Sequence, residues 1–201
     1  ETLVGEMKPV NDPRLEVFGN PARTNGEFIG LKFGEEENIG TEEFSLLGVE
    51  IYAQDAPVYL VTYAQTLFAL AEASERGWIS DDTETFYNTA IEQSVLQWTG
   101  SDDVLEQLLS NSQIAFDPDR AIEQISRQRY VHLFMFGYEA WSEMRRTGYP
   151  ENLVSPAGAA IPTRLSYPEN ESFNNTANYD EAVQRQFGGV DSIYGKVWWD
   201  E

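Results

Sequence analysis

The chain has 201 residues, and its 34 Asp and Glu against 13 Lys and Arg give a formal net charge of -21. This acidic excess argues against binding to nucleic acid or to an anionic lipid surface, because both need cationic contacts. An apolar fraction of 41% and an aromatic fraction of 13% exclude a disordered acidic chain, and the absence of cysteine excludes disulfides and thiolate metal sites. There is no run of about 18 apolar residues, so no membrane-spanning helix is expected.

Residues 1–56 are interrupted by proline and glycine, and no helical period persists there, which predicts an irregular, loop-rich segment. Three of its aromatic residues, Phe28, Phe33 and Tyr52, are candidate ligand-binding residues, since aromatic rings stack on the C–H faces of sugars. Long ordered loops are where binding residues concentrate. The alternative interpretation is that these rings hold a long loop onto the helices.

Residues 57–110 have the pattern of a helical hairpin followed by a short helix over 103–109. The first helix is expected to start near Pro57, with Leu60 on its apolar face, and to end before Gly77. The second is expected to start at a capping box that Asp81 opens and to end at Gly100. A partial tetratricopeptide signature spans both helices, in which small residues allow close helix packing; its members are Leu70, Ala71, Tyr87 and Ala90.

Residues 111–150 are predicted to hold the longest helix, over 118–147. Asp117 can cap its start, Pro118 suits the first helical position, and Gly148 can end it in a left-handed conformation. If continuous, this helix is roughly 45 Å long at about 1.5 Å per residue. It therefore serves as the central element of the expected fold.

Residues 151–201 are again rich in proline, glycine and asparagine, which predicts an irregular segment packed on the helices, with one short helix over 179–187. The terminal residues Val197, Trp198 and Trp199 are apolar enough that we expect them to pack down.

Few residues support catalysis. The single histidine, His132, excludes a multi-His metal site, and it is best explained as structural. Glu139 lies among apolar residues, where burial raises a carboxyl pKa toward the range of a general acid. A glycosidase needs a second carboxylate across the scissile bond, and Glu143, one turn away, is the nearest candidate. The alternative, that Glu139 pairs with an arginine or holds a loop amide, is favoured; no catalytic residue, metal or cofactor is predicted.

Several motifs occur together along the chain and resemble one known family. Asp12-Pro13-Arg14-Leu15 comes first, then the helix over 62–77 and the stretch 128–150, which contains Glu139-Ala140-Trp141. The motif Ile161-Pro162-x-Arg164-Leu165-x-Tyr167-Pro168 and the terminal Val197-Trp198-Trp199-Asp200 follow. In this order the motifs resemble the SusD/RagB family of outer-membrane nutrient-binding lipoproteins, over nearly the whole chain.

The resemblance implies one mainly α, SusD-like domain whose N-terminal part is absent here, together with that part's lipid-anchoring cysteine. It also implies a location at the surface of the outer membrane. The implied function is non-catalytic binding of oligosaccharide, with peptide as an alternative ligand, and delivery to a SusC-type TonB-dependent transporter. Two other hypotheses stay open: a glycan hydrolase that uses an acid such as Glu139, and a purely structural helical scaffold that contacts only protein.

Overall fold

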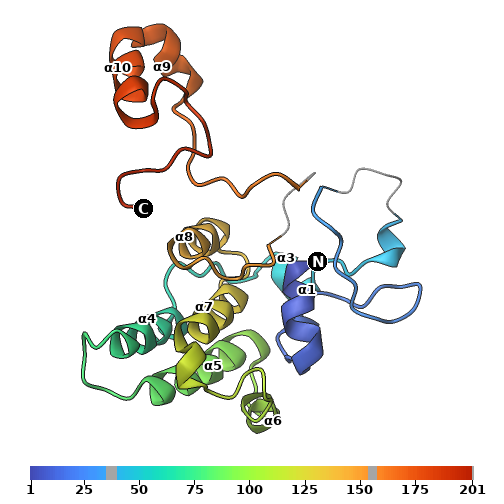
Figure 1. The fold of residues 1–201 in the computed structure, drawn as a ribbon. Helices are drawn as coiled ribbons and strands as arrows, with labels where there is room; N and C mark the ends of the chain where they lie inside the picture. The colour runs from blue at the N-terminus through green and yellow to red at the C-terminus, as the bar shows by residue number, and fades with distance from the viewer. Residues whose placement is uncertain (35–39, 154–157, 201) are drawn as a thin grey trace. The chain divides into compact units, whose positions relative to one another are not determined.

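The computed structural model describes residues 1–34, 40–153 and 158–200, and helices dominate them (Figure 1). The elements are α1 (Thr2–Met7), η1 (Lys8–Val10), α2 (Leu15–Phe18), η2 (Thr41–Glu43), α3 (Val49–Tyr52), α4 (Tyr63–Glu75), α5 (Thr83–Thr99), α6 (Leu105–Leu109), η3 (Pro118–Arg120), α7 (Ala121–His132), α8 (Gly137–Thr147), α9 (Glu169–Asn174) and α10 (Thr176–Phe187). These ranges contain no strand, and their one isolated β-bridge pairs Gly19 with Leu47. The predicted mainly α fold is confirmed. The chain forms two compact units, Glu1–Val154 and Ser155–Glu201, whereas the four-segment division of the sequence stays a prediction.

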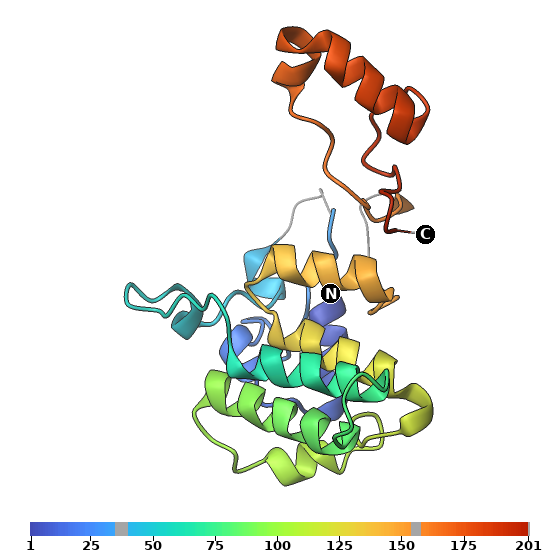
Figure 2. The same cartoon turned by 90° about the vertical axis from the view of Figure 1, so that its left-hand side faces the viewer.

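The hairpin of α4 and α5 carries the main hydrophobic core of the first unit, with the two helices side by side in Figure 2. Phe68 and Ala71 of α4 and Tyr87, Ala90 and Ile91 of α5 are all 0% exposed. The small alanines let the two helix backbones approach closely, which is the packing that the tetratricopeptide-like spacing predicts. Helix α5 ends as expected, since Gly100 has a left-handed φ of 72°.

The start of the first hairpin helix differs from the prediction. Helix α4 begins after Thr62, whose side chain accepts a hydrogen bond from the Gln65 backbone while the Gln65 side chain accepts one from the Thr62 backbone. This capping box satisfies two otherwise free N–H groups, so it fixes the helix start more firmly than a proline does. Pro57 and Leu60 therefore precede the helix, and Leu60 is 84% exposed rather than part of an apolar helical face.

The expected continuous helix over 118–147 is divided. Asp117 caps η3, as predicted, and α7 follows directly, but the chain leaves the helix after His132 and Met135 adopts a left-handed φ of 71°. Leu133 is 1% exposed, and Phe134 stacks on Phe18 at 4.2 Å between ring centroids. The stacking of Phe134 on the N-terminal segment accompanies the break, which an uninterrupted apolar pattern does not reveal. Helix α8 then ends as predicted, with Gly148 at φ 79°.

The N-terminal segment is more helical than its sequence indicates, because α1, η1 and α2 pack into the first unit. Arg14 anchors this packing and is 0% exposed. Its guanidinium forms a bidentate ion pair with Asp12 and donates to Ser94 Oγ of α5 at 2.7 Å and to Gln128 Oε1 of α7 at 2.8 Å. One buried cation therefore joins three segments that are distant in sequence.

His132 extends this buried network. Its Nδ1 lies 2.8 Å from Ser94 Oγ, and its Nε2 lies 2.7 Å from Thr62 Oγ1. Ser94 Oγ accepts from Arg14 and Thr62 Oγ1 donates to Gln65, so an imidazole with its proton on Nε2 satisfies both contacts: Nδ1 accepts from Ser94 and Nε2 donates to Thr62. Burial is the main reason that the His132 pKa falls to about 3, and the positive charges of Arg14 and Arg129 lower it further. The structural interpretation of this histidine is supported.

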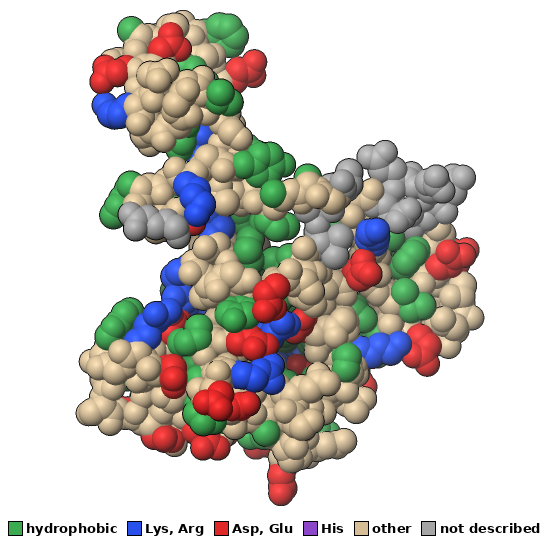
Figure 3. All heavy atoms as spheres, in the orientation of Figure 1, with side chains coloured by type: hydrophobic (Ala, Val, Ile, Leu, Met, Phe, Trp, Pro, Cys, Tyr) green, Lys and Arg blue, Asp and Glu red, His purple; other side chains and the backbone are tan. Residues whose placement is uncertain are grey.

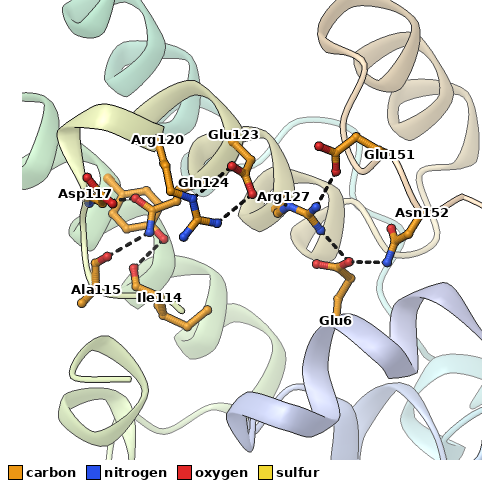
Figure 4. A network of polar contacts seen from close by, with 11 residues as sticks. Glu6, Ile114, Ala115, Asp117, Arg120, Glu123, Gln124, Arg127, Glu151 and Asn152 are labelled. Atoms are coloured by element: carbon orange, nitrogen blue, oxygen red, sulfur yellow. Dashed lines mark hydrogen bonds and ion pairs between the residues drawn. The ribbon is translucent and has the colours of Figure 1, made fainter. Parts of the chain in front are cut away.

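A second polar network, at Arg127 of α7, holds α1 and the segment after α8 together (Figure 4). The Arg127 guanidinium donates to Glu6 of α1 at 2.7 Å, to Glu123 at 3.1 Å and to Glu151 at 2.5 Å. Asn152 completes the network by donating to Glu6 at 2.8 Å. One arginine thus holds the carboxylates of Glu6, Glu123 and Glu151 close together in this acidic chain. Figure 3 shows further basic side chains among acidic ones on the visible face of the first unit.

The second unit contains α9 and α10, and α10 extends the predicted helix over 179–187 at its start. Arg164, 7% exposed, donates to Asp191 at 2.5 Å and lies 4.1 Å from the Phe187 ring centroid. Within the second unit the terminal tryptophans do not both pack down as expected, since Trp198 is 89% exposed. In the described residues of both units, no helix is long and apolar enough to cross a membrane.

Candidate functional site

A cavity of about 250 Å³ in the first unit, here named the aromatic cavity, is formed where four segments meet. These are α2, α3 with the loop that follows it, the end of α5, and the turn between α7 and α8. Figure 2 shows α3 and that loop, in teal, projecting to one side of the helices. The lining residues are Val17, Glu50, Ile51, Ala56, Pro57, Val58, Tyr59, Gln97, Trp98, Met135 and Phe136.

Glycine at position 48 allows α3 to lie against α2 and so to complete this cavity. A Cβ atom at Gly48 would lie 2.0 Å from the carbonyl oxygen of Val17, which is far inside van der Waals contact. Two backbone hydrogen bonds fix this close approach. The Gly48 N–H donates to the carbonyl oxygen of Phe18 at 3.0 Å, and the Asn20 N–H donates to the carbonyl oxygen of Leu46 at 2.8 Å. Only glycine fits here, because the obstacle is backbone that cannot rotate away.

We therefore expect Gly48→Ala to displace α3 and to lower the free energy of unfolding by about 1–3 kcal/mol, the typical cost of overpacking. Urea-induced unfolding followed by circular dichroism measures this change. Gly26→Ala is not a suitable control because Gly26 has a φ of 75°, whereas Gly5 has open space and an ordinary φ. Gly5→Ala should leave the stability unchanged or slightly raised, and an equal loss in both variants would contradict this explanation.

Trp98, at the end of α5, forms the aromatic wall of the cavity. Its ring meets Phe18 edge-on at 4.9 Å and Tyr59 edge-on at 5.5 Å between centroids. Such edge-to-face pairs stabilise the arrangement beyond the area that they bury. The Trp98 ring is thus held in place by the core on one side, while Tyr59 reaches it from the loop before α4.

The cavity combines this aromatic wall with few polar groups, as small-molecule sites usually do. Glu50 contributes a carboxylate that is exposed to solvent, and Gln97 contributes a side-chain amide. The buried Nε2 of Gln97 and Nε1 of Trp98 have no hydrogen-bond partner in the part of the chain that the structure describes. Buried donors normally have partners, so each of these two nitrogens carries an energetic cost in the described part of the chain.

The three residues predicted to bind ligand lie on different surfaces. Tyr52 is 64% exposed and follows Ile51, which lines the aromatic cavity. Phe28 is partly buried against the core and lines a separate, more polar groove of about 690 Å³. Phe33 is 66% exposed and lines neither hollow. A ligand-binding role for each of them stays a prediction.

The sequence analysis did not single out the residues that line the aromatic cavity, such as Tyr59, Gln97, Trp98 and Met135. One signal was available: Val58, Tyr59, Leu60 and Val61 form an apolar run directly before the Thr62 capping box. Because this run precedes the helix, its apolar side chains do not belong to the helix's buried face and need another explanation. The contribution of Met135 had no such signal, since it depends on the break between α7 and α8.

The acids proposed for a hydrolase are not arranged for catalysis. Glu139 is exposed, so it lacks the apolar surroundings that the general-acid hypothesis requires. Glu143 is engaged by Arg129 at 3.2 Å and by Arg146 at 2.7 Å. Burial alone would raise the pKa of Glu72, the acid opposite Arg146, but hydrogen bonds from Arg146 and Arg76 outweigh burial and lower it. Glu72 and Glu143 are therefore ion-paired supports of α4 and α8.

The hydrogen bond between Ser94 and His132 has the residue types of a nucleophile and its base. Both residues are 0% exposed, so no substrate reaches them. The described ranges also contain no group of three or more His, Cys, Asp or Glu residues placed to hold a metal ion. The aromatic cavity is therefore the best-supported candidate site, and its lining suits binding.

A sequence model of the SusD-like family, described as starch-binding and associating with the outer membrane, matches residues 1–168. No curated protein matches the chain. Among solved structures, the chain is similar to a SusD homologue of Bacteroides fragilis NCTC 9343, with 29% identity and a TM-score of 0.86 over 100% of this chain and 51% of that one.

Two further structures are similar. A protein described as chitin-binding has 30% identity and a TM-score of 0.83 over 99% of this chain and 49% of its own. An outer-membrane protein of Bacteroides vulgatus ATCC 8482, described in connection with nutrient binding, has 25% identity and a TM-score of 0.83 over 100% of this chain and 50% of its own. The chain thus spans about half the length of these relatives.

Proposed function

This chain belongs to the SusD-like family, and from that premise we propose that it is part of a non-catalytic protein that binds oligosaccharide at the bacterial surface. The family is associated with the outer membrane, and its description names starch as a ligand. A relative with 30% identity is described as chitin-binding. Glycan is therefore the ligand class that we assign, with peptide as the alternative.

The observation that carries this proposal is the composition of the aromatic cavity. Trp98 and Tyr59 supply rings that suit the C–H faces of a sugar, and Glu50 and Gln97 supply groups that suit its hydroxyls. Tyr52 is exposed and follows the lining residue Ile51 in sequence, so it stays a candidate for the same surface. A hydrolase needs two carboxylates across a bond, and Glu50 is the one carboxylate among the lining residues.

We further propose that the bound glycan is delivered to a SusC-type TonB-dependent transporter, and that a lipid-anchored N-terminal part holds the whole protein at the outer membrane. The family resemblance supports both statements. The length of the relatives, about twice that of this chain, is consistent with a further part of the protein.

Isothermal titration against maltoheptaose, cellotriose, triacetylchitotriose and a mixed-sequence octapeptide tests the binding proposal, with product analysis of the same samples. We expect binding of at least one glycan and no product. Hydrolysis of a bound glycan would show a hydrolase instead, and binding of the octapeptide alone would show a peptide receptor. No binding of any probe would contradict the proposal and favour a structural scaffold.

A further inference from the structure

Four consecutive apolar residues lie directly before α4 and are here named the apolar loop: Val58, Tyr59, Leu60 and Val61. The Tyr59 ring packs on Trp98, but Val58, Leu60 and Val61 are each at least 80% exposed. A single exposed apolar side chain is ordinary on a protein surface. Three of them within four residues form a contiguous apolar surface, which marks an interaction site.

The backbone of the apolar loop also lacks partners. Among residues 1–34, 40–153 and 158–200, none forms a hydrogen bond with a backbone N–H or carbonyl group of these four residues. Hydrogen bonding resumes at Thr62, which caps α4. A segment with free N–H and C=O groups can pair with another segment of chain. The apolar loop therefore offers a partner both apolar side chains and backbone groups.

Two contacts hold the apolar loop in place. The rings of Tyr59 and Trp98 meet edge-on at 5.5 Å between centroids, and Thr62 Oγ1 lies 2.7 Å from Nε2 of the buried His132. Figure 2 shows the loop, in teal, projecting beside the helices. A loop that is already held loses little conformational freedom when a partner packs on it, which favours docking.

A second copy of this chain is a poor partner for the apolar loop. Each copy has a formal net charge of -21, so two copies repel each other. The three exposed side chains offer roughly 200–350 Å², at about 60–120 Å² for each buried aliphatic side chain. A stable interface between separate proteins buries about 800 Å² on each partner. A segment of the same polypeptide can use a smaller surface, because the covalent connection gives it a high effective concentration.

The related structures contain enough additional chain to provide such a segment. Three of them align with 99–100% of this chain and with only 49–51% of their own length. Residues 56–71 carry no charged side chain, so the loop repels neither an acidic nor a basic segment. We propose that the apolar loop packs against the N-terminal part of the same polypeptide, outside these 201 residues. This inference concerns the assembly of the whole protein and does not depend on the ligand that it binds.

Hydrogen–deuterium exchange of the 201-residue chain and of the full-length protein from the same gene tests this inference. The amides of residues 58–61 should exchange at least about 10-fold more slowly in the full-length protein, because packing shields them and supplies partners. Ile79 and Ser80, in the turn between α4 and α5, are the control. Their amides also lack backbone partners in the described ranges, and they should exchange equally in both proteins.

The double variant Leu60→Ser with Val61→Ser removes two apolar side chains of the loop. In the full-length protein it should speed exchange of residues 58–61 at least about 5-fold, after correction for the intrinsic rate of serine amides. The urea midpoint of the 201-residue chain should not change, because both side chains are exposed there. Leu165→Ser with Val190→Ser is the matched control, since both residues are 67% exposed, and it should leave exchange of residues 58–61 unchanged.

Equal exchange of residues 58–61 in the two proteins would overturn this inference. Protection that is already present in the 201-residue chain would also overturn it. Such protection would identify a second copy as the partner if it depends on protein concentration, and a cover within the chain if it does not. Protection in the full-length protein that survives Leu60→Ser with Val61→Ser would show that the packing does not use these side chains. Glycan binding is measured separately by titration, so its failure would contradict the proposed function and leave this inference standing.

Discussion

Replacing Arg14 with leucine is expected to lower the free energy of unfolding by about 3–5 kcal/mol, the usual cost of removing one partner from a buried ion pair. The reason is that the Asp12 carboxylate, whose side chain is 1% exposed, would remain charged without its cation. Ser94 and Gln128 would lose a hydrogen-bond donor in the same step. A loss of this size is a large part of the stability of an ordinary domain.

Urea-induced unfolding of the wild-type and variant chains, followed by circular dichroism, measures this loss. Arg23→Leu is the matched control, because Arg23 lies 3.7 Å from Glu42 with 78% of its side chain exposed. An exposed pair of this kind contributes little. The double variant Asp12→Asn with Arg14→Leu should recover part of the stability, since no buried charge is left alone. A loss below about 1 kcal/mol for Arg14→Leu would show that the network does not stabilise the fold.

Acidification is expected to destabilise the chain through His132. Its pKa is 6.5 in the unfolded chain and about 3 in the folded one, mainly because the imidazole is buried and secondly because Arg14 and Arg129 are near. Between these values the unfolded state binds more protons, so stability falls as the pH falls. The contribution is complete above about pH 6.5 and is lost as the pH approaches 3.

The size of this effect follows from about 1.4 kcal/mol for each pKa unit. At pH 4.5 the wild type should have lost about 3 kcal/mol through His132 alone. Carboxylates are also protonated in this pH range and lower the stability of every variant. The effect of His132 is therefore measured by comparing the wild type with a variant that lacks this histidine. The fall in unfolding free energy from pH 7.5 to pH 4.5 should be about 3 kcal/mol larger in the wild type than in His132→Gln. The same fall in both proteins would mean that His132 does not control acid stability.

The candidate site shows how far a single sequence leads. Of the three predicted residues, Phe28 lines a separate groove, and Tyr52 and Phe33 are exposed and line neither hollow, so their roles stay predictions. Trp98 has the same residue type as many core tryptophans, and only its contact with Tyr59 and its place among the lining residues make it part of a cavity wall. Composition identifies aromatic residues, but it does not tell which of them share a surface.

The sequence alone determined the helical class, the α4–α5 hairpin and the helix ends at Gly100 and Gly148, because these depend on local periodicity and on backbone conformations that favour glycine. The tertiary structure decided where α7 ends, since Phe134 leaves the helical path and stacks on Phe18, far away in sequence. It also decided that Arg14 and His132 share one buried network, because Ser94 and Thr62, from distant parts of the chain, complete it. Contacts between residues far apart in sequence leave no periodic pattern, and such contacts bring together the four segments that line the aromatic cavity.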